Sequence, residues 1–212
     1  MVKIIIGILL AALLAVAAWF LLMQRGPDLS KYEGLRQPRI EPMADQRMLV
    51  VRATGDPNTA GMKAFGTLFK AFFALKRKAK GVAMAAPRAR WPLPLDTPKD
   101  QWVGIYGMPV PNDIQLLPQG VAGAELETWQ YGTVAQILHV GPYSAEPPTI
   151  QRLLKFIEDG GYQVAGPHEE EYLRGPSMFG KGNPDKYYTI IRYAVTAKAD
   201  TAAKPPAKPK GK

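Results

Sequence analysis

The sequence contains no cysteine and only two histidines, His139 and His168. Without cysteine the chain has no disulfide, no thiolate metal ligand and no thiol nucleophile, and its redox compartment stays open. Neither histidine belongs to an HExxH motif or another metal-ligand spacing, and no glycine run has the form of a phosphate-binding or dinucleotide-binding loop. Ser144 and Ser177 lie outside any GxSxG elbow. These absences argue against a metal-dependent or nucleotide-dependent enzyme, so we expect no cofactor, no metal and no assigned catalytic residue.

Charge is missing from one long stretch near the start of the chain. Residues Ile4 to Met23 are uncharged, and about 20 helical residues at 1.5 Å each cross a hydrocarbon core of roughly 30 Å. We predict a transmembrane anchor at residues 1–23, in a single-pass protein of a bacterial inner membrane. A cleaved signal peptide competes, because Ala15 and Ala17 fit a small-x-small rule, but apolar residues continue beyond them. Positive charges flank the run on both sides, so the side of the remaining chain stays open.

Composition separates one globular domain from two polar segments. The 212 residues, 47% of them hydrophobic, suffice for one domain with a core and appendages. Residues 24–45 hold three prolines among mixed charges and show no sustained period, which indicates a linker. Residues 196–212 offer no bulky anchor, so we predict a disordered basic tail. This tail holds five lysines, so the domain at residues 46–195 is only moderately basic despite a net charge of +9.

The second half of this domain has a strand, helix, strand, strand pattern. An apolar, β-branched run from Val134 to Val140 stops at Gly141-Pro142. A helix with one buried stripe follows and ends at Gly160-Gly161, residues suited to the left-handed conformation that closes helices. Two further strands are predicted at residues 162–173 and 186–195. The apolar stripe of the helix consists of Ile150, Leu153, Leu154 and Ile157.

The first half repeats this pattern without repeating the identities. A short apolar strand at residues 48–51 is followed by the turn at Gly55-Asp56-Pro57-Asn58 and a helix. Strands at residues 82–93 and 101–109 would complete the module, and residues 111–123 would form a connecting loop. The stripe of the first helix has the same spacing and consists of Phe65, Leu68, Phe69 and Phe72.

A basic run, residues 76–80, closes the first helix. Cations there complement the negative end of the helix dipole, and Gly81 can cap the helix. The alternative interpretation is a patch that contacts anionic lipid headgroups, which a membrane-tethered domain would meet. No helix-turn-helix precedes the domain, so we expect no specific nucleic-acid partner.

Several motifs of the second half carry a family resemblance. HVGPY, an amphipathic helix, GGY, ExYL and a terminal TxIxxxV occur in this order from residue 139. Residues 46–195 thereby resemble the GyrI-like small-molecule-binding domain, which includes effector-binding domains of AraC- and MerR-type regulators. The resemblance implies an α+β fold: two β-α-β-β modules forming a mostly antiparallel sheet, two helices on one face, and a ligand site between the modules.

Glu170 is the best candidate for a ligand contact. In the family that this chain resembles, a glutamate two residues before this tyrosine lies between the modules and favours cationic, amphipathic ligands. Tyr172 shares its strand face because side chains alternate along a strand. Tyr143, Trp102 and Tyr106 are predicted as aromatic walls that add cation–π attraction. The competing interpretation is that residues 169–171 form a solvated acidic run and the aromatic residues are core.

One departure from the family concerns a second acid. Many members have TEI on the last strand, where this chain has Thr189-Ile190-Ile191. The family includes hydrolases of reactive small molecules, and the lost acid puts hydrolysis in doubt here. The sequence thus predicts a membrane-anchored domain that binds an apolar or cationic small molecule. The alternatives are a hydrolase of a reactive small molecule and a protein-interaction module.

Overall fold

A computed structural model describes residues 28–94, 96–176 and 182–198. The chain divides into two compact units, Met1–Lys31 and Tyr32–Lys212, and all features below belong to the second. The predicted anchor and residues 199–212 of the predicted tail lie outside the described residues. None of the helices within the described ranges is long and apolar enough to span a bilayer.

Two α-helices and nine strands make up the described fold. The helices are α2 (Met62–Lys78) and α3 (Pro147–Asp159). The strands are β1 (Arg39–Met43), β2 (Gln46–Thr54), β3 (Arg88–Trp91), β4 (Val103–Pro109), β5 (Glu125–Trp129), β6 (Gly132–Val140), β7 (Tyr162–Val164), β8 (His168–Arg174) and β9 (Tyr188–Ala197). Short helical turns are η1 (Ser30–Arg36), η2 (Pro57–Gly61), η3 (Lys99–Gln101), η4 (Tyr143–Ala145) and η5 (Pro184–Lys186).

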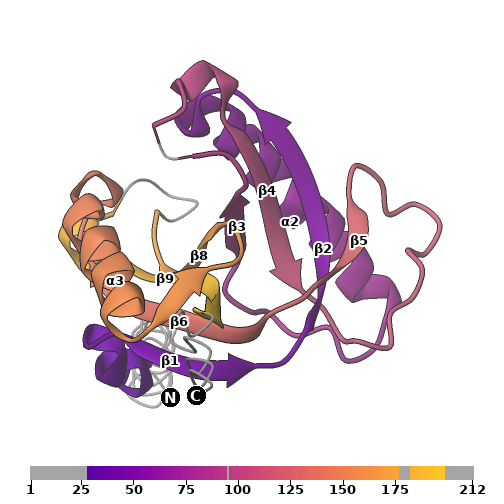
Figure 1. The fold of residues 1–212 in the computed structure, drawn as a ribbon. Helices are drawn as coiled ribbons and strands as arrows, with labels where there is room; N and C mark the ends of the chain where they lie inside the picture. Colours follow the sequence, from indigo (N-terminus) through magenta and orange to yellow (C-terminus); the bar gives the residue numbers. More distant parts are fainter. Residues whose placement is uncertain (1–27, 95, 177–181, 199–212) are drawn as a thin grey trace, which may run out of the picture. The chain divides into compact units, whose positions relative to one another are not determined.

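The strands form one curled antiparallel sheet in the order β1-β6-β9-β8-β3-β4-β2-β5, with β7 paired to β9 (Figure 1). Its two ends meet, because β1 continues into β2 and β5 continues into β6 across short bends. The register is unbroken through the bends: Met43 pairs with Gly132, and Gln46 pairs with Trp129. Two long bent strands therefore join both halves of the sheet.

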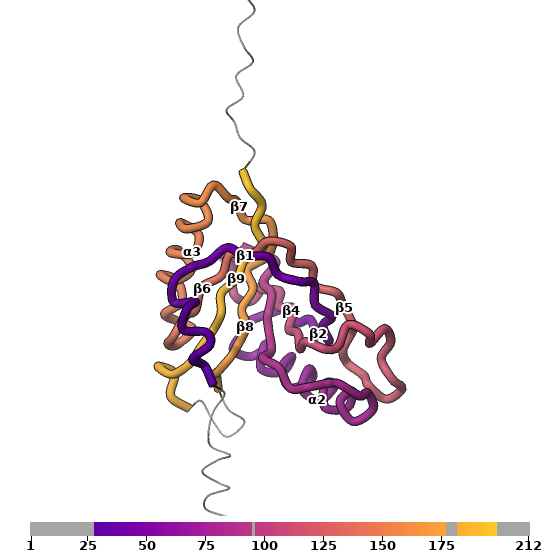
Figure 2. Tube along the Cα trace, turned by 90° about the horizontal axis from the view of Figure 1, so that it is seen from below, coloured from indigo at the N-terminus to yellow at the C-terminus, as the bar shows by residue number. Residues whose placement is uncertain are grey.

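Both α-helices pack on the same face of the sheet. The buried side of α2 covers residues of β2, β3 and β4, among them Leu49, Ala89 and Met108. The helix α3 covers residues of β6 and β9, among them Ile137 and Ile191. Figure 2 shows the two helices as separate blocks, α3 beside β6 and β9 and α2 beside β4 and β2. This arrangement confirms the predicted α+β class and leaves β3 and β8 in the middle, where the halves join.

The predicted repeat is present in the backbone as well as in the pattern. Gly55 and Gly141 each follow a strand, and their φ angles of 118° and 137° favour glycine. The N–H of Gly55 donates to the carbonyl of Trp102 (2.8 Å), and that of Gly141 to the carbonyl of Tyr187 (3.1 Å). Trp102 and Tyr187 stand directly before β4 and β9, the last strands of the two halves.

Three predicted segments need correction. Strand β1 lies inside residues 24–45, which the prolines suggested to be a linker; the pairing with β6 holds it in the sheet. The strand expected at residues 82–93 is only four residues long, since β3 begins at Arg88, after Pro87, and ends at Trp91, before Pro92. The strand expected at residues 162–173 divides into β7 and β8 around Gly166-Pro167.

Candidate functional site

Glu170 lies at the point where the two halves of the sheet join. On β8 it pairs with Ala89 of β3 on one side and Ile191 of β9 on the other. Paired residues of adjacent strands point to the same face, so Glu170 lies on the face that carries both helices. Ala89 packs in the core beneath α2, and Ile191 packs in the core beneath α3. A carboxylate therefore occupies the gap between two apolar cores.

The Glu170 carboxylate points into the protein and accepts two side-chain hydrogen bonds. Tyr172 Oη donates to Oε2 (2.6 Å), and His168 Nε2 lies 2.9 Å from Oε1, with 12% of the Glu170 side chain exposed. His168 Nδ1 lies 2.8 Å from the hydroxyl of Tyr193. The histidine tautomer with its proton on Nε2 satisfies both contacts, donating to Glu170 and accepting from Tyr193.

A continuous row of aromatic rings runs past Glu170. Tyr172 contacts Phe65 of α2 and Tyr143 of η4, each with ring centroids 5.7 Å apart. Both pairs are edge-to-face, the geometry that aromatic quadrupoles prefer. Tyr143 also contacts Tyr187, with ring centroids 5.3 Å apart. The rings thus connect α2 to the start of α3 across the carboxylate.

The five residues predicted from the sequence lie at different distances along this row. Glu170, Tyr172 and Tyr143 lie together. Tyr106 is one ring further away, in contact with Phe65 (4.9 Å between centroids), and is 2% exposed. Trp102 is at the far end and reaches Tyr106 only through Trp91, which contacts both. No ligand is present, so the ligand-binding roles of all five residues stay predictions.

A second carboxyl group, which the sequence did not reveal, lies beside Glu170. Glu146 directly precedes α3 and is 5% exposed. Burial raises its pKa to about 9, and the nearby Glu170 carboxylate adds to this effect. Glu146 is therefore protonated at neutral pH. Glu146 lies at the start of α3 and interacts with Thr189 of β9 as well as with Glu170.

The tyrosines around the two carboxyl groups also stay protonated. Burial, followed by the Glu170 charge, raises the pKa of both the Tyr143 and the Tyr172 hydroxyl. Tyr106 and Tyr193 have a pKa of about 12 for the same two reasons. These groups can donate hydrogen bonds but do not add negative charge at neutral pH.

His139 has a structural role in this region. Its Nδ1 lies 3.0 Å from the Thr149 hydroxyl, and its Nε2 lies 3.2 Å from the Pro142 carbonyl. Burial lowers its pKa, so the neutral ring is favoured. The histidine connects β6 to the loop and helix start that carry Tyr143 and Glu146, and these contacts help to fix the positions of both side chains.

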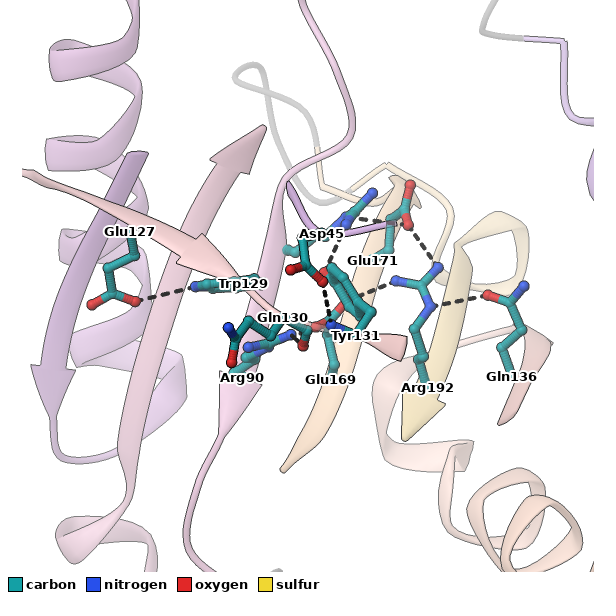
Figure 3. Close-up of polar contacts among 11 residues, drawn as sticks. Asp45, Arg90, Glu127, Trp129, Gln130, Tyr131, Gln136, Glu169, Glu171 and Arg192 are labelled. Atoms are coloured by element: carbon teal, nitrogen blue, oxygen red, sulfur yellow. Dashed lines mark hydrogen bonds and ion pairs between the residues drawn. The ribbon is translucent and has the colours of Figure 1, made fainter. Parts of the chain in front are cut away.

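The opposite face of β8 carries a buried network of ion pairs (Figure 3). Glu169 accepts hydrogen bonds from Arg90 Nε (2.7 Å), Arg192 Nη1 (2.7 Å) and Tyr131 Oη (2.9 Å). Glu171 accepts one from Arg192 Nη2 (3.0 Å) and lies 3.3 Å from Arg88 Nε. The interpretation of residues 169–171 as a solvated acidic run is therefore wrong, because each carboxylate is directed into the protein.

Aromatic side chains hold the arginines of this network in place. The guanidinium carbon of Arg90 lies 4.1 Å from the ring centroid of Trp129 and 4.9 Å from that of Tyr131, within cation–π range. Burial lowers the pKa of Arg192, but the carboxylates of Glu171 and Glu169 outweigh it and raise the pKa above its usual value. A hollow of about 860 Å³ is bordered by Tyr131, Arg90, Glu169 and Arg192. The Glu169 carboxylate there already pairs with both arginines.

Metal coordination has no support in the part of the chain that the structure describes. No cluster of three or more histidine, aspartate or glutamate side chains there could hold a metal ion. The helix face of β8 instead offers a carboxylate, a protonated carboxyl group and aromatic rings. This set of groups suits an organic cation or an apolar molecule.

Comparisons with known proteins agree with this fold. Residues 36–194 match the model of a family described as "GyrI-like small molecule binding domain". Among solved structures, the fold is similar to a hydrolase from Listeria innocua (TM-score 0.63, 21% identity, 76% of this chain and 92% of that one). It is also similar to the C-terminal domain of EcmrR (TM-score 0.55, 16% identity, 77% and 98%). EcmrR in an EcmrR–DNA complex matches with a TM-score of 0.58 and 15% identity over 90% of this chain and 66% of that one. A search of curated proteins found no match.

Proposed function

The chain belongs to the family of GyrI-like small molecule binding domains, and from this premise we propose that it captures an apolar or cationic small molecule beside Glu170. Tyr172 and Tyr143 form the nearest walls of this site, and Tyr106 and Trp102 extend it. The predicted anchor at residues 1–23 holds the domain at a membrane.

One observation supports this site above all others. Among the described contacts, Glu170 pairs with no arginine or lysine, whereas Glu169 and Glu171 on either side of it each contact two arginines. A carboxylate without a permanent cation, surrounded by aromatic rings, is set up to gain a cation from a ligand. Cation–π attraction adds about 0.5 to 2 kcal/mol where the cation is desolvated.

The test is thermal unfolding of the full chain with a panel of aromatic ammonium compounds and their neutral isosteres. A ligand whose free concentration is 100 times its Kd stabilises the folded state by about 2.7 kcal/mol. We expect a rise in Tm with cationic members of the panel and its loss in Glu170→Gln. Glu158→Gln is the matched control, because Glu158 lies on α3 with its side chain 76% exposed. No shift across the panel, or an equal shift in Glu170→Gln, contradicts the proposal.

The surface of α2 supports contact with an anionic membrane. The helix contains five basic residues and no acidic one, and Phe73 is 39% exposed on it. We expect a probe on a single introduced cysteine at position 73, unique in this cysteine-free chain, to report an apolar environment on anionic but not on zwitterionic nanodiscs. The same probe at Leu116, 85% exposed on a loop, is the control. Reporter fusions at the C-terminus would identify the side of the membrane.

The carboxyl pair also supports a second candidate function, hydrolysis of a reactive small molecule. Glu146, with a pKa of about 9, could donate a proton while the Glu170 carboxylate activates water, as general acid–base catalysis requires. The similar fold of a Listeria innocua hydrolase is consistent with this role. Turnover of strained or activated substrates, abolished in both Glu146→Gln and Glu170→Gln, would distinguish it from stoichiometric binding.

A further inference from the structure

Two buried polar atoms near Glu170 lack a hydrogen bond of good geometry, although the Glu146 carboxyl group is close enough to interact with both Thr189 and Glu170. They are Oε1 of Glu146 and Oγ1 of Thr189, on residues that are 5% and 0% exposed. Thr189 begins the buried part of β9, and Glu146 stands at the start of α3. Leaving a buried polar group unpaired costs about 1 to 3 kcal/mol, so each such group in a folded protein calls for an explanation.

A purely structural role does not explain the position of Glu146. An acidic residue at a helix start usually caps the free N–H groups or faces solvent near the positive end of the dipole. Glu146 makes no side-chain capping hydrogen bond, and its carboxyl group is buried beside another carboxylate. The arrangement costs stability and gains no helix cap, which points to a partner that arrives from outside the chain.

We propose that Glu146 and Thr189 accept the N–H groups of the bound cation. The site then selects hydrogen-bond-donating organic cations, such as primary ammonium and amidinium groups, over quaternary ammonium groups of the same hydrophobic size. This inference rests on the function proposed above: Glu170 and the rings attract any cation, and Glu146 with Thr189 discriminates among cations. A quaternary group has no N–H to offer and leaves both acceptors unpaired.

Binding of such a cation also releases a proton. The free protein keeps Glu146 protonated because of burial and the neighbouring Glu170. An incoming ammonium group brings a positive charge next to both carboxyl groups, so Glu146 loses its O–H proton to solvent while the ligand keeps its own. The titratable groups that face the Glu146 and Glu170 carboxyl groups are His168 and Tyr172 of β8, Tyr143 of η4, His139 of β6, Tyr106 of β4 and Tyr193 of β9.

The experiment compares two probes, naphthylmethylammonium and its N,N,N-trimethyl analogue, by calorimetric titration of the full chain at pH 7. We expect the primary ammonium to bind about tenfold more tightly or better, the gain of a charge-assisted hydrogen bond. Titrations in phosphate and in Tris, whose ionisation enthalpies differ, should show release of about one proton with the primary ammonium and close to none with the quaternary one.

Variants separate this inference from the function on which it rests. Glu146→Gln keeps a neutral group of the same shape and should bind both probes with similar affinity and without proton release. Thr189→Val should reduce the preference severalfold, and Glu158→Gln should leave it unchanged. Equal affinities and equal proton release in the unaltered chain overturn the inference even if both probes bind. Failure of both probes to bind instead counts against the proposed function.

Discussion

The two faces of strand β8 place the same residue type in opposite situations. On one face, Glu169 and Glu171 are held by Arg88, Arg90 and Arg192, and their charges are cancelled within the fold. On the other face, Glu170 accepts hydrogen bonds from His168 and Tyr172, lies beside the Glu146 carboxyl group, and contacts no arginine or lysine among the described residues. Three consecutive glutamates therefore divide into two that pair with arginines across the sheet and one, Glu170, that pairs with no arginine or lysine among the described contacts.

This difference teaches that burial alone does not identify a functional carboxylate. Glu169 is 2% exposed, more buried than the side chain of Glu170, yet its hydrogen bonds are complete. A carboxylate that already pairs with two arginines has little to gain from a cationic ligand, whereas a carboxylate that pairs with no arginine or lysine has more to gain. The nature of the partners separates a structural acid from a binding one.

The largest loss of folding stability is expected when the network of ion pairs around Glu169 and Glu171 loses Arg192, which contacts both glutamates. Arg192→Met leaves Glu169 and Glu171 buried without one of their arginines, and breaking a buried pair costs about 3 to 5 kcal/mol. Urea denaturation should show this loss in the free energy of unfolding. Arg52→Met is the control, because Arg52 also contacts two glutamates but its side chain is 47% exposed, so less than about 1 kcal/mol should be lost. Equal losses in both variants would mean that burial of the network adds nothing.

A second prediction compares the same substitution at two adjacent glutamates, one on each face of β8. Glu169→Gln removes the charge that Arg90 and Arg192 share and should destabilise the fold by about 3 kcal/mol. Glu170→Gln leaves no arginine unpaired and should change stability by about 1 kcal/mol or less. Unfolding of both variants without ligand measures the comparison directly. A greater loss for Glu170→Gln than for Glu169→Gln would reverse the roles assigned to the two faces.

The third effect, the smallest when counted per pH unit, is a pH dependence specific to the helix face. Glu146 has a folded-state pKa of about 9 against 4.5 in its unperturbed state, so the folded chain holds one more proton between these values. Its contribution to stability is present at low pH and is lost as pH rises, by at most about 1.4 kcal/mol per pH unit. Subtracting the stability curve of Glu146→Gln from that of the unaltered chain isolates the slope. A difference that stays flat from pH 5 to pH 8 would show that Glu146 is ionised in the folded state.

Local pattern in the sequence was sufficient for much of the fold. Both modules were predicted from the apolar stripes at Phe65 to Phe72 and Ile150 to Ile157 and from the glycine before each helix. Apolar periodicity and a positive φ angle both depend on residues that are close together in the sequence. The alternation of side chains along β8 also placed Glu170 and Tyr172 on one face. These features depend on spacing within a few residues.

Features that depend on distant partners were not predictable in this way. Strand β1 has a linker-like composition and is a strand only because it meets β6, almost a hundred residues later. Nothing near Glu146 signals burial, since an acid before Pro147 at a helix start normally faces solvent. An acid directly before a predicted helix, in a chain that lacks its family's second acid, is the one signal that could have drawn attention to it.

The pairing of residues 39–43 and 46–50 with residues 132–136 and 125–129, in one constant register, limits how the two halves can separate. Each half of the sheet lends a strand to the other: β1 completes the half that carries α3, and β5 completes the half that carries α2. A movement that separates the two halves of the sheet would break main-chain hydrogen bonds between these paired strands. If a ligand binds beside Glu170 as proposed, this shared pairing favours entry by movement of side chains such as Tyr143 and Tyr172 over separation of the two halves.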